Sequence, residues 1–103
     1  MTNDLEQAFH EAMKTIYIRA KEEADYTATR FMQMVANKGG LETAQYLLHS
    51  STVSEGYSSL WERNRLDLTV EALVLNPKWH SLFTAEELEI ARNRLVEYGY
   101  TFQ

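Results

Sequence analysis

The chain contains no cysteine among its 103 residues. Disulfide frameworks, zinc sites built on thiolates and cysteine nucleophiles are therefore excluded together. The chain also lacks an apolar run long enough to cross a bilayer, and its opening stretch MTNDLEQAFHEAMK is acidic where a secretory signal is basic. These absences predict a cytoplasmic protein that does not associate with a membrane.

Positive charge is scarce as well. Ten lysines and arginines stand against fifteen acidic residues, which gives a formal net charge of −5. This balance repels nucleic-acid phosphates at long range and disfavours a broad electrostatic docking surface. The charge balance does not exclude a local basic patch.

Hydrophobic residues make up 45% of the chain and charged residues 24%. A chain of this length buries roughly two-thirds of its unfolded surface, which is enough for one domain. The low hydrophobicity of disordered proteins is absent. We therefore expect residues 1–103 to form a single helical domain that folds alone or as a small oligomer.

Apolar spacing predicts the helices of the N-terminal part. In residues 4–24 apolar side chains recur at intervals of three and four, which predicts a long helix with one inward face, capped by Asn3 or Asp4. Ile18 falls opposite that face, so we expect an exposed aliphatic side chain there, either without a role or in contact with a partner.

Residues 27–37 are apolar on nearly every side of the helical wheel, which predicts a central, buried helix. The glycines of KGG end it, and residues 41–49 start a third helix. Met32 and Met34 either fill the core or form an adaptable binding surface. Both interpretations are left open by the spacing alone.

The C-terminal part carries clear helix-start signals. Ser54 is placed to cap one helix, and residues 66–75 predict a short, mostly buried helix capped by Asp67 or Thr69. TAEE at 84–87 is a capping box that opens the last helix. No strand pair is indicated, so the predicted fold is all-α, a single-domain orthogonal bundle of five to seven helices.

No motif carries recognisable catalytic chemistry. HEAMK begins like a zinc-protease signature but has Lys14 where the second histidine is required, which leaves His10 as a helix-surface residue pairing with Glu6 or Lys14. His49 and His80 lie at predicted helix ends, where an imidazole satisfies terminal carbonyls. We expect no enzyme, metal site or cofactor, unless one subunit completes the site of another.

The densest stretch is LWERNRLDLTVEALVL, residues 60–75, in which arginines and carboxylates precede an apolar run. It predicts a structural clasp, because a guanidinium presents a fork of donors that fits a carboxylate. Arg63 or Arg65 would be the donor. The candidate carboxylates are Glu62, Asp67 and Glu71.

Several segments resemble a family of short, uncharacterised bacterial all-helical proteins whose sequence also occurs within longer proteins. These segments are ADYTATRFMQMV, GGLETAQYLL, GYSSLWE, RLDLTVEALVL and LFTAEELEIARNRLVEYGY, nearly the whole chain. The resemblance implies the all-helical fold and carries over no catalytic or binding residue. Its association with restriction-like and mobile-element proteins adds slight support to a role near nucleic acid, without outweighing the acidic balance.

The first functional hypothesis is a non-enzymatic interaction module that binds a protein partner or a second copy of the chain. Trp61, Arg63 and Arg65 would form its surface, with Ile18, because tryptophan and arginine are enriched at binding hot spots. The alternative is an accessory nucleic-acid protein whose Arg30, Arg63 and Arg65 contact phosphate. A third hypothesis has the acidic faces of the first and last helices mimic nucleic acid toward a basic partner. No small-molecule substrate is indicated.

Overall fold

The computed structural model describes residues 2–101, and over that range all regular structure is helical. The α-helices are α1 (Thr2–Glu23), α2 (Thr29–Lys38), α3 (Gly40–His49), α4 (Glu55–Glu62), α5 (Val70–Val74) and α6 (Ala85–Glu97). Two 3-10 helices, η1 (Leu66–Leu68) and η2 (Pro77–Leu82), flank α5. The predicted all-α bundle is confirmed. No helix in the described range is both long and apolar enough to span a membrane.

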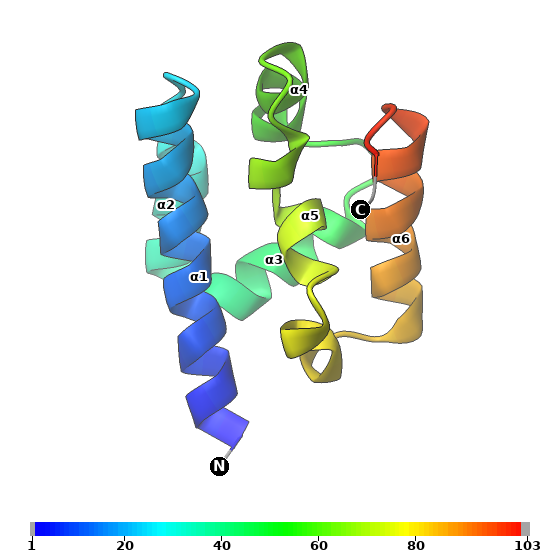
Figure 1. Ribbon diagram of the computed structural model, residues 1–103. Coiled ribbons are helices and arrows are strands. Elements are labelled where there is room, and N and C mark those ends of the chain that lie inside the picture. Colours follow the sequence, from blue (N-terminus) through cyan, green and yellow to red (C-terminus); the bar gives the residue numbers. More distant parts are fainter. Residues whose placement is uncertain (1, 102–103) are drawn as a thin grey trace.

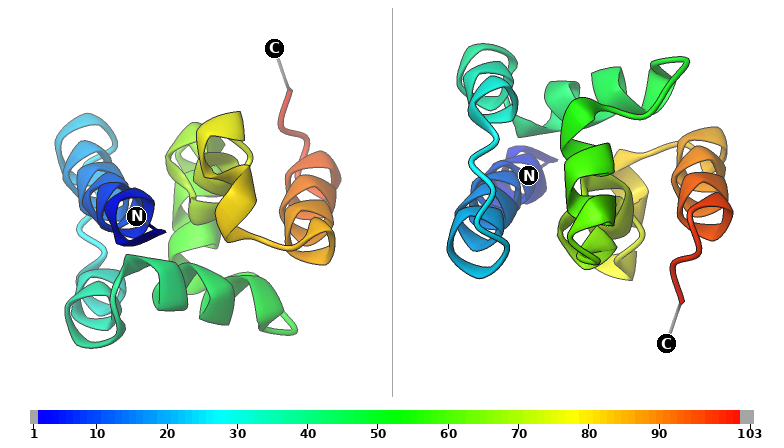
Figure 2. Two further views of the ribbon diagram at one scale, coloured as in Figure 1. Left: turned by 90° about the horizontal axis from the view of Figure 1, so that it is seen from below. Right: turned by 90° about the horizontal axis from the view of Figure 1, so that it is seen from above.

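Helix α3 crosses the molecule behind the other helices and joins two groups of them (Figures 1 and 2). Helices α1 and α2 lie side by side over one end of α3, and α6 lies at its other end, with α4 and α5 between them. Helix α2 packs mainly on α1 and α3 and makes no comparable contact with α4 or α5. One side of α2 therefore faces α4 without touching it closely.

The main core forms where α1 meets η2 and the segment after it. Phe9 of α1 is fully buried and meets the rings of Trp79 and Phe83 edge-on, with centroids 5.3 and 5.4 Å away. Edge-to-face packing is the favoured geometry for such rings because each has a negative face and a positive edge. Met13, one turn further along α1, is also fully buried. This core fixes the inner face of α1, as the three- and four-residue spacing predicts.

The turn between α2 and α3 depends on two adjacent glycines. Gly39 has φ 88°, a backbone conformation that favours glycine. At Gly40 a Cβ would lie 2.7 Å from the Cα of His10, so only a glycine lets α3 approach α1 this closely. The Gly40 amide donates a hydrogen bond to His10 Nδ1 at 2.9 Å. The expected pairing of His10 with Glu6 or Lys14 is therefore wrong, because its ring joins α1 to α3.

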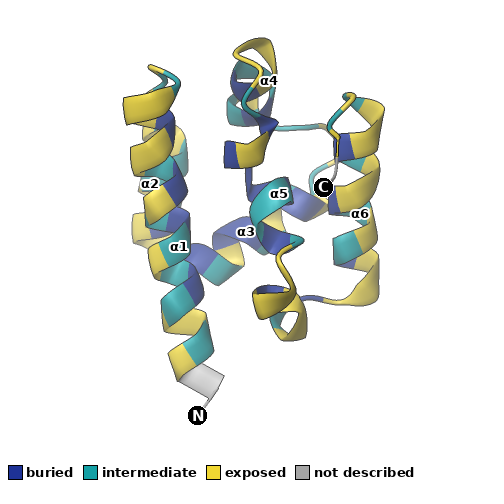
Figure 3. Cartoon of the chain, in the orientation of Figure 1, coloured by how far each residue is buried: buried dark blue, intermediate teal, exposed yellow. Residues whose placement is uncertain are grey.

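Helix α2 is not the central, buried helix that its composition predicts. Val35 is its only buried residue, and much of its surface is half-buried or exposed (Figure 3). Met32 packs against the main core, whereas Met34 lies outside that cluster and faces a cleft. Phe31 and Met32 pack against the main core, Met34 is half-buried in the cleft lining, and the exposed residues of α2 are polar except Ala36.

Local helix signals mostly agree with the structure. Thr84 and Glu87 form the reciprocal capping box at the start of α6, and Ser54 caps α4 by accepting the Tyr57 amide. Thr69, not Asp67, caps α5, and the helix expected over 66–75 divides into η1 and α5. Helix α1 begins at Thr2, so positions 3 and 4 both lie inside it, and the predicted cap at Asn3 or Asp4 is wrong.

Substituting alanine for Gly40 is expected to lower the free energy of unfolding by about 1–3 kcal/mol, because the new methyl group overlaps backbone of α1. Urea titration followed by circular dichroism measures the change.

Gly56→Ala is the matched control. A Cβ at Gly56 would have its nearest neighbour, Tyr26 Oη, at 3.7 Å, an ordinary contact. Alanine also favours the helix, so stability should hold or rise by up to about 1 kcal/mol. Equal losses at Gly40 and Gly56 would contradict the close approach of α3 to α1.

Candidate functional site

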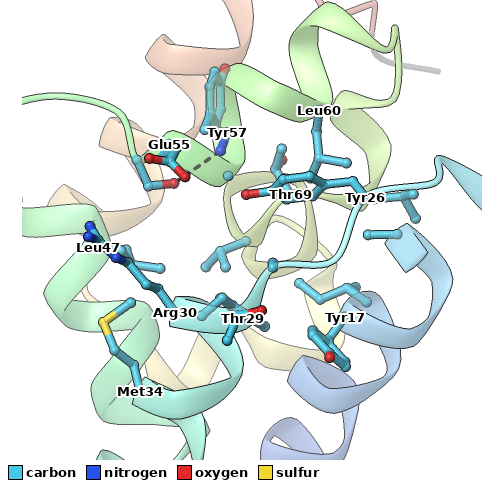
Figure 4. A pocket seen from close by; sticks show the side chains of 18 of the residues that line it. Tyr17, Tyr26, Thr29, Arg30, Met34, Leu47, Glu55, Tyr57, Leu60 and Thr69 are labelled. Carbon is cyan, nitrogen blue, oxygen red and sulfur yellow. Dashed lines mark hydrogen bonds between the residues drawn. The ribbon is translucent and has the colours of Figure 1, made fainter.

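A cleft of about 780 Å³ lies between α2 and α4, and residues of α1, α3, η1 and α5 complete its lining (Figure 4). Its volume is in the range of sites that bind drug-sized ligands. In Figure 4 the side chains of Arg30 and Met34 lie on the α2 side, opposite Tyr57 and Leu60 of α4. Five aromatic rings contribute to the lining: Tyr17, Tyr26, Phe31, Tyr46 and Tyr57. The cleft is thus an aromatic and aliphatic surface between two helices that do not pack together.

Polar groups deep in the cleft already have partners within the chain. Ser54 Oγ accepts the Tyr57 amide, and Thr69 Oγ1 donates to Leu66 O and accepts from the Ala72 amide. The Tyr57 hydroxyl donates to a backbone carbonyl of α6, and burial raises the pKa of this phenol, so it stays protonated. The base of the cleft therefore presents mostly apolar surface, and the hydroxyls of Tyr17 and Tyr26 are its half-buried groups without a hydrogen bond in the described range.

The rim of the cleft, unlike its base, carries exposed polar side chains. Arg30, Gln33 and Asn37 lie on α2 at intervals of three and four residues, and Glu55 lies at the start of α4. All four side chains are exposed, and none makes a hydrogen bond or ion pair with another residue of the described range. Such a polar rim around an apolar base is typical of an interface.

Arg94 of α6 closes the far side of the base. Its guanidinium donates to Glu71 Oε2 at 2.9 Å and to the carbonyls of Leu47 and Ser50 at the end of α3. Burial raises the pKa of the Glu71 carboxyl, and the hydrogen bond from Arg94 offsets part of that effect. The expectation that Glu71 pairs with Arg63 or Arg65 is wrong, because its side chain points to α6 across the core.

Arg65 forms the clasp that the sequence predicts, with one partner from outside the stretch. Its guanidinium contacts Asp67 Oδ1 at 2.9 Å and Glu23 Oε1 at 2.7 Å, and so ties η1 to the end of α1. Hydrogen bonds from Arg19 and then Arg65 lower the pKa of Glu23 to about 2. Glu62, the third carboxylate proposed for the clasp, is exposed and makes no ion pair in the described range.

Arg63 acts at the same junction without a carboxylate. It donates to Ala24 O and Ser59 O, and its guanidinium lies 5.1 Å from the centre of the Tyr26 ring. Arg63 and Arg65 are thus both engaged within the chain, which leaves Arg30 as the arginine of the predicted set without a partner in the described range. Tyr26, held by Arg63, lines the end of the cleft next to α4.

Trp61 and Ile18 are both 48% exposed, and neither lines the cleft. The Trp61 indole donates to Tyr98 O at 3.2 Å and packs edge-on to the Tyr98 ring, so its position is fixed by α6. Ile18 stands on the outer face of α1, as predicted. Arg30 lines the cleft, whereas Trp61 and Ile18 do not, so the three predicted binding residues do not share one surface.

The histidines have structural partners. His80 Nε2 lies 2.9 Å from Leu75 O, as expected for an imidazole beside a helix end. His49 Nε2 lies 2.8 Å from Glu87 Oε2, a side-chain contact between α3 and α6 instead of the predicted carbonyl contact. No three histidine or carboxylate side chains of the described range are grouped as a metal site would require.

Arg94 had a signal in the sequence. It lies three residues after Ala91 and four before Tyr98, and this spacing puts it on the inward side of α6. A buried guanidinium needs bonded partners, so the spacing alone would have predicted a buried ion pair. The aromatic lining of the cleft has no such signal, because its rings come from helices whose relative placement is tertiary.

Comparisons with protein families, curated proteins and solved structures gave no match. The resemblance to a bacterial helical family stays a prediction. Function is therefore inferred from the cleft and the residues around it.

Arg94→Met is expected to lower the free energy of unfolding by about 3–5 kcal/mol, because it leaves Glu71 buried without its cation. Urea titration measures this loss. Arg94→Met combined with Glu71→Met should recover part of it, since the unpaired charge is gone. A single variant as stable as the wild type would contradict the role of this pair.

Acid stability should depend on Glu23. Its folded-state pKa of about 2 lies below the ordinary 4.5, so its ionised form stabilises the fold above pH 4.5 and that contribution is lost as the pH falls toward 2. Glu23→Gln should therefore flatten the dependence of the urea midpoint on pH between about 4.5 and 2. Glu22→Gln, at an exposed neighbour outside the clasp, should leave the dependence unchanged. Parallel profiles for all three proteins would rule out the Glu23 clasp.

Proposed function

We propose that this protein is a non-enzymatic helical interaction module that binds a protein partner in the cleft between α2 and α4. The cleft itself carries the proposal: its base is aromatic and aliphatic, and its rim holds unpaired polar groups. Exposed apolar surface bordered by polar residues is characteristic of interaction sites. Met34 adds to this, because the methionine side chain adapts to different partner shapes.

The cleft replaces the surface that the sequence predicts for the same function. Trp61 packs on Tyr98, and Arg63 and Arg65 hold η1 and α4 to the end of α1. Arg63 and Arg65 therefore help to hold the walls of the cleft in place. Trp61 and Ile18 lie on surfaces beside the cleft. Arg30, which the sequence suggests as a phosphate contact, lies at the cleft rim and would meet the protein partner there.

These contacts support the nucleic-acid hypothesis less than they support a protein-binding role. Gripping phosphate requires free cations, and two of the three proposed arginines donate to groups of the chain itself. The formal net charge of −5 also disfavours binding to phosphate. Binding to DNA or RNA at low salt that weakened when Arg63 and Arg65 were replaced by alanine would favour that alternative.

A photo-cross-linking residue tests the proposal directly. We expect p-benzoylphenylalanine in place of Gln33, on the cleft rim, to give a discrete adduct with a protein in the native cells. The same residue in place of Glu89, exposed on α6 and away from the cleft, should not give that adduct.

Met34→Asp, which adds a carboxylate to the cleft lining outside the main core cluster, should abolish the Gln33 adduct while the circular dichroism spectrum stays helical. The mass of the adduct distinguishes a second copy of the chain from another protein. Identical adducts from both positions, or none from Gln33, would exclude the cleft as a partner site.

A further inference from the structure

We infer that the occupant of the cleft is one amphipathic α-helix of a partner protein, about two turns long, with acidic residues facing α2 and basic residues facing α4. This inference rests on the proposed function, since it names the shape and charge of the partner at the same site. Three features of the cleft support this inference: its helical walls, the hydrogen bonds that its polar groups already make, and the opposite charges on its two rims.

The walls favour a helix over an extended peptide. An extended segment adds to a protein by pairing its backbone with an exposed strand edge, and the described chain has no strand. The backbone groups of α2 and α4 are mostly used within their own helices. A helix satisfies its own backbone hydrogen bonds, so it needs only side-chain contacts from walls that are themselves helices.

The distribution of polar groups favours a protein segment over a small molecule. Small-ligand sites fix orientation through polar groups that converge inside the pocket. Here Ser54, Thr69 and Tyr57 have partners within the chain, and Glu71 is held by Arg94. Apart from the hydroxyls of the half-buried Tyr17 and Tyr26, the polar side chains without a partner in the described range lie at the exposed rim, where a protein partner extends beyond the cleft and meets them.

The length of the cleft sets the length of the occupant. Along α2 the rim runs from Arg30 to Asn37, about 10 Å at a rise of roughly 1.5 Å per residue. Packed helices lie about 8–10 Å apart, and two turns present apolar side chains at i, i+3 or i+4, and i+7. Such a stripe would cover Met34 and the aromatic lining together.

The two rims carry opposite charges. Arg30 is the one charged residue that α2 contributes to the lining, and Glu55 is the one that α4 contributes. Neither has a partner in the described range. A helix lying between them satisfies both when its flank toward α2 is acidic and its flank toward α4 is basic. This arrangement also selects the direction in which the helix lies.

Two designed 14-residue peptides, fluorescein-labelled and capped at both ends, serve as probes. Both carry the same leucine stripe; one has glutamates on one flank and lysines on the other, and the second has glutamine at all those positions. Fluorescence anisotropy measures the dissociation constants, and circular dichroism measures the gain of helix on binding.

The wild type is expected to bind both peptides and to bind the charged one about three- to tenfold more tightly, the effect of two partly exposed ion pairs. Arg30→Gln combined with Glu55→Gln should remove this difference and keep binding of the glutamine peptide. Lys21→Gln combined with Glu22→Gln makes the same charge changes on exposed positions of α1 outside the cleft and should preserve the difference.

Each other outcome contradicts the inference. Failure of both peptides to bind, or binding without a gain of helix, excludes a helical occupant. Equal binding of the two peptides by the wild type excludes the charge arrangement. If a Gln33 adduct with a cellular protein is still observed in either case, the cleft remains a partner site and only the helical occupant is rejected. An adduct of twice the chain mass identifies a second copy instead.

Discussion

The guanidinium of Arg94 joins the end of α3 to α5 and α6 through three hydrogen bonds, two to carbonyls and one to the Glu71 carboxylate. The backbone carbonyl of the same residue accepts the Tyr57 hydroxyl from α4. Taking a charge out of water is costly unless it is paired and hydrogen-bonded, so this residue allows little variation in how the four helices meet. Helices α3, α4, α5 and α6, which occupy the middle and right of Figure 1 with α3 reaching across from α2, are therefore held together.

The opposite side of the molecule is held at its ends. Gly40 and His10 bring α3 against α1 near one end, and Arg65 bonds to Glu23 at the other. Helix α2 is attached to α1 and α3 and has no comparable contact with α4. Helix α4 is thus held by hydrogen bonds outside the cleft and α2 by its packing on α1 and α3, and a space lined largely by apolar side chains lies between them.

Short-range relations in this chain could be predicted from the sequence, and long-range ones could not. The capping box of Thr84 and Glu87 and the exposure of Ile18 follow from spacing of at most a few residues. Arg94 reaches partners 23 to 47 residues away, and no local pattern specifies them. For the same reason Glu71 was expected to pair with a neighbouring arginine.

Helix α2 shows why the candidate site was only partly predicted. Its apolar residues on several sides fit two situations equally well, burial within the core or exposure of one side to a partner. The helical wheel does not distinguish them, because the difference lies in whether α4 covers α2. Arg30 was suggested as a phosphate contact from its charge, yet the aromatic rings that line the same cleft come together only in the fold.

A partner site between α2 and α4 requires the face of α2 toward α4 to be open in solution. Methionine methyl groups report on this directly: Met34 lines the cleft, whereas Met13 is fully buried in the core. With both methyl groups labelled with carbon-13, a soluble nitroxide added to the free protein should broaden the NMR signal of Met34 strongly and leave that of Met13 nearly unchanged. Equal protection of the two signals would show that α2 and α4 close on each other, and would exclude a partner site between them.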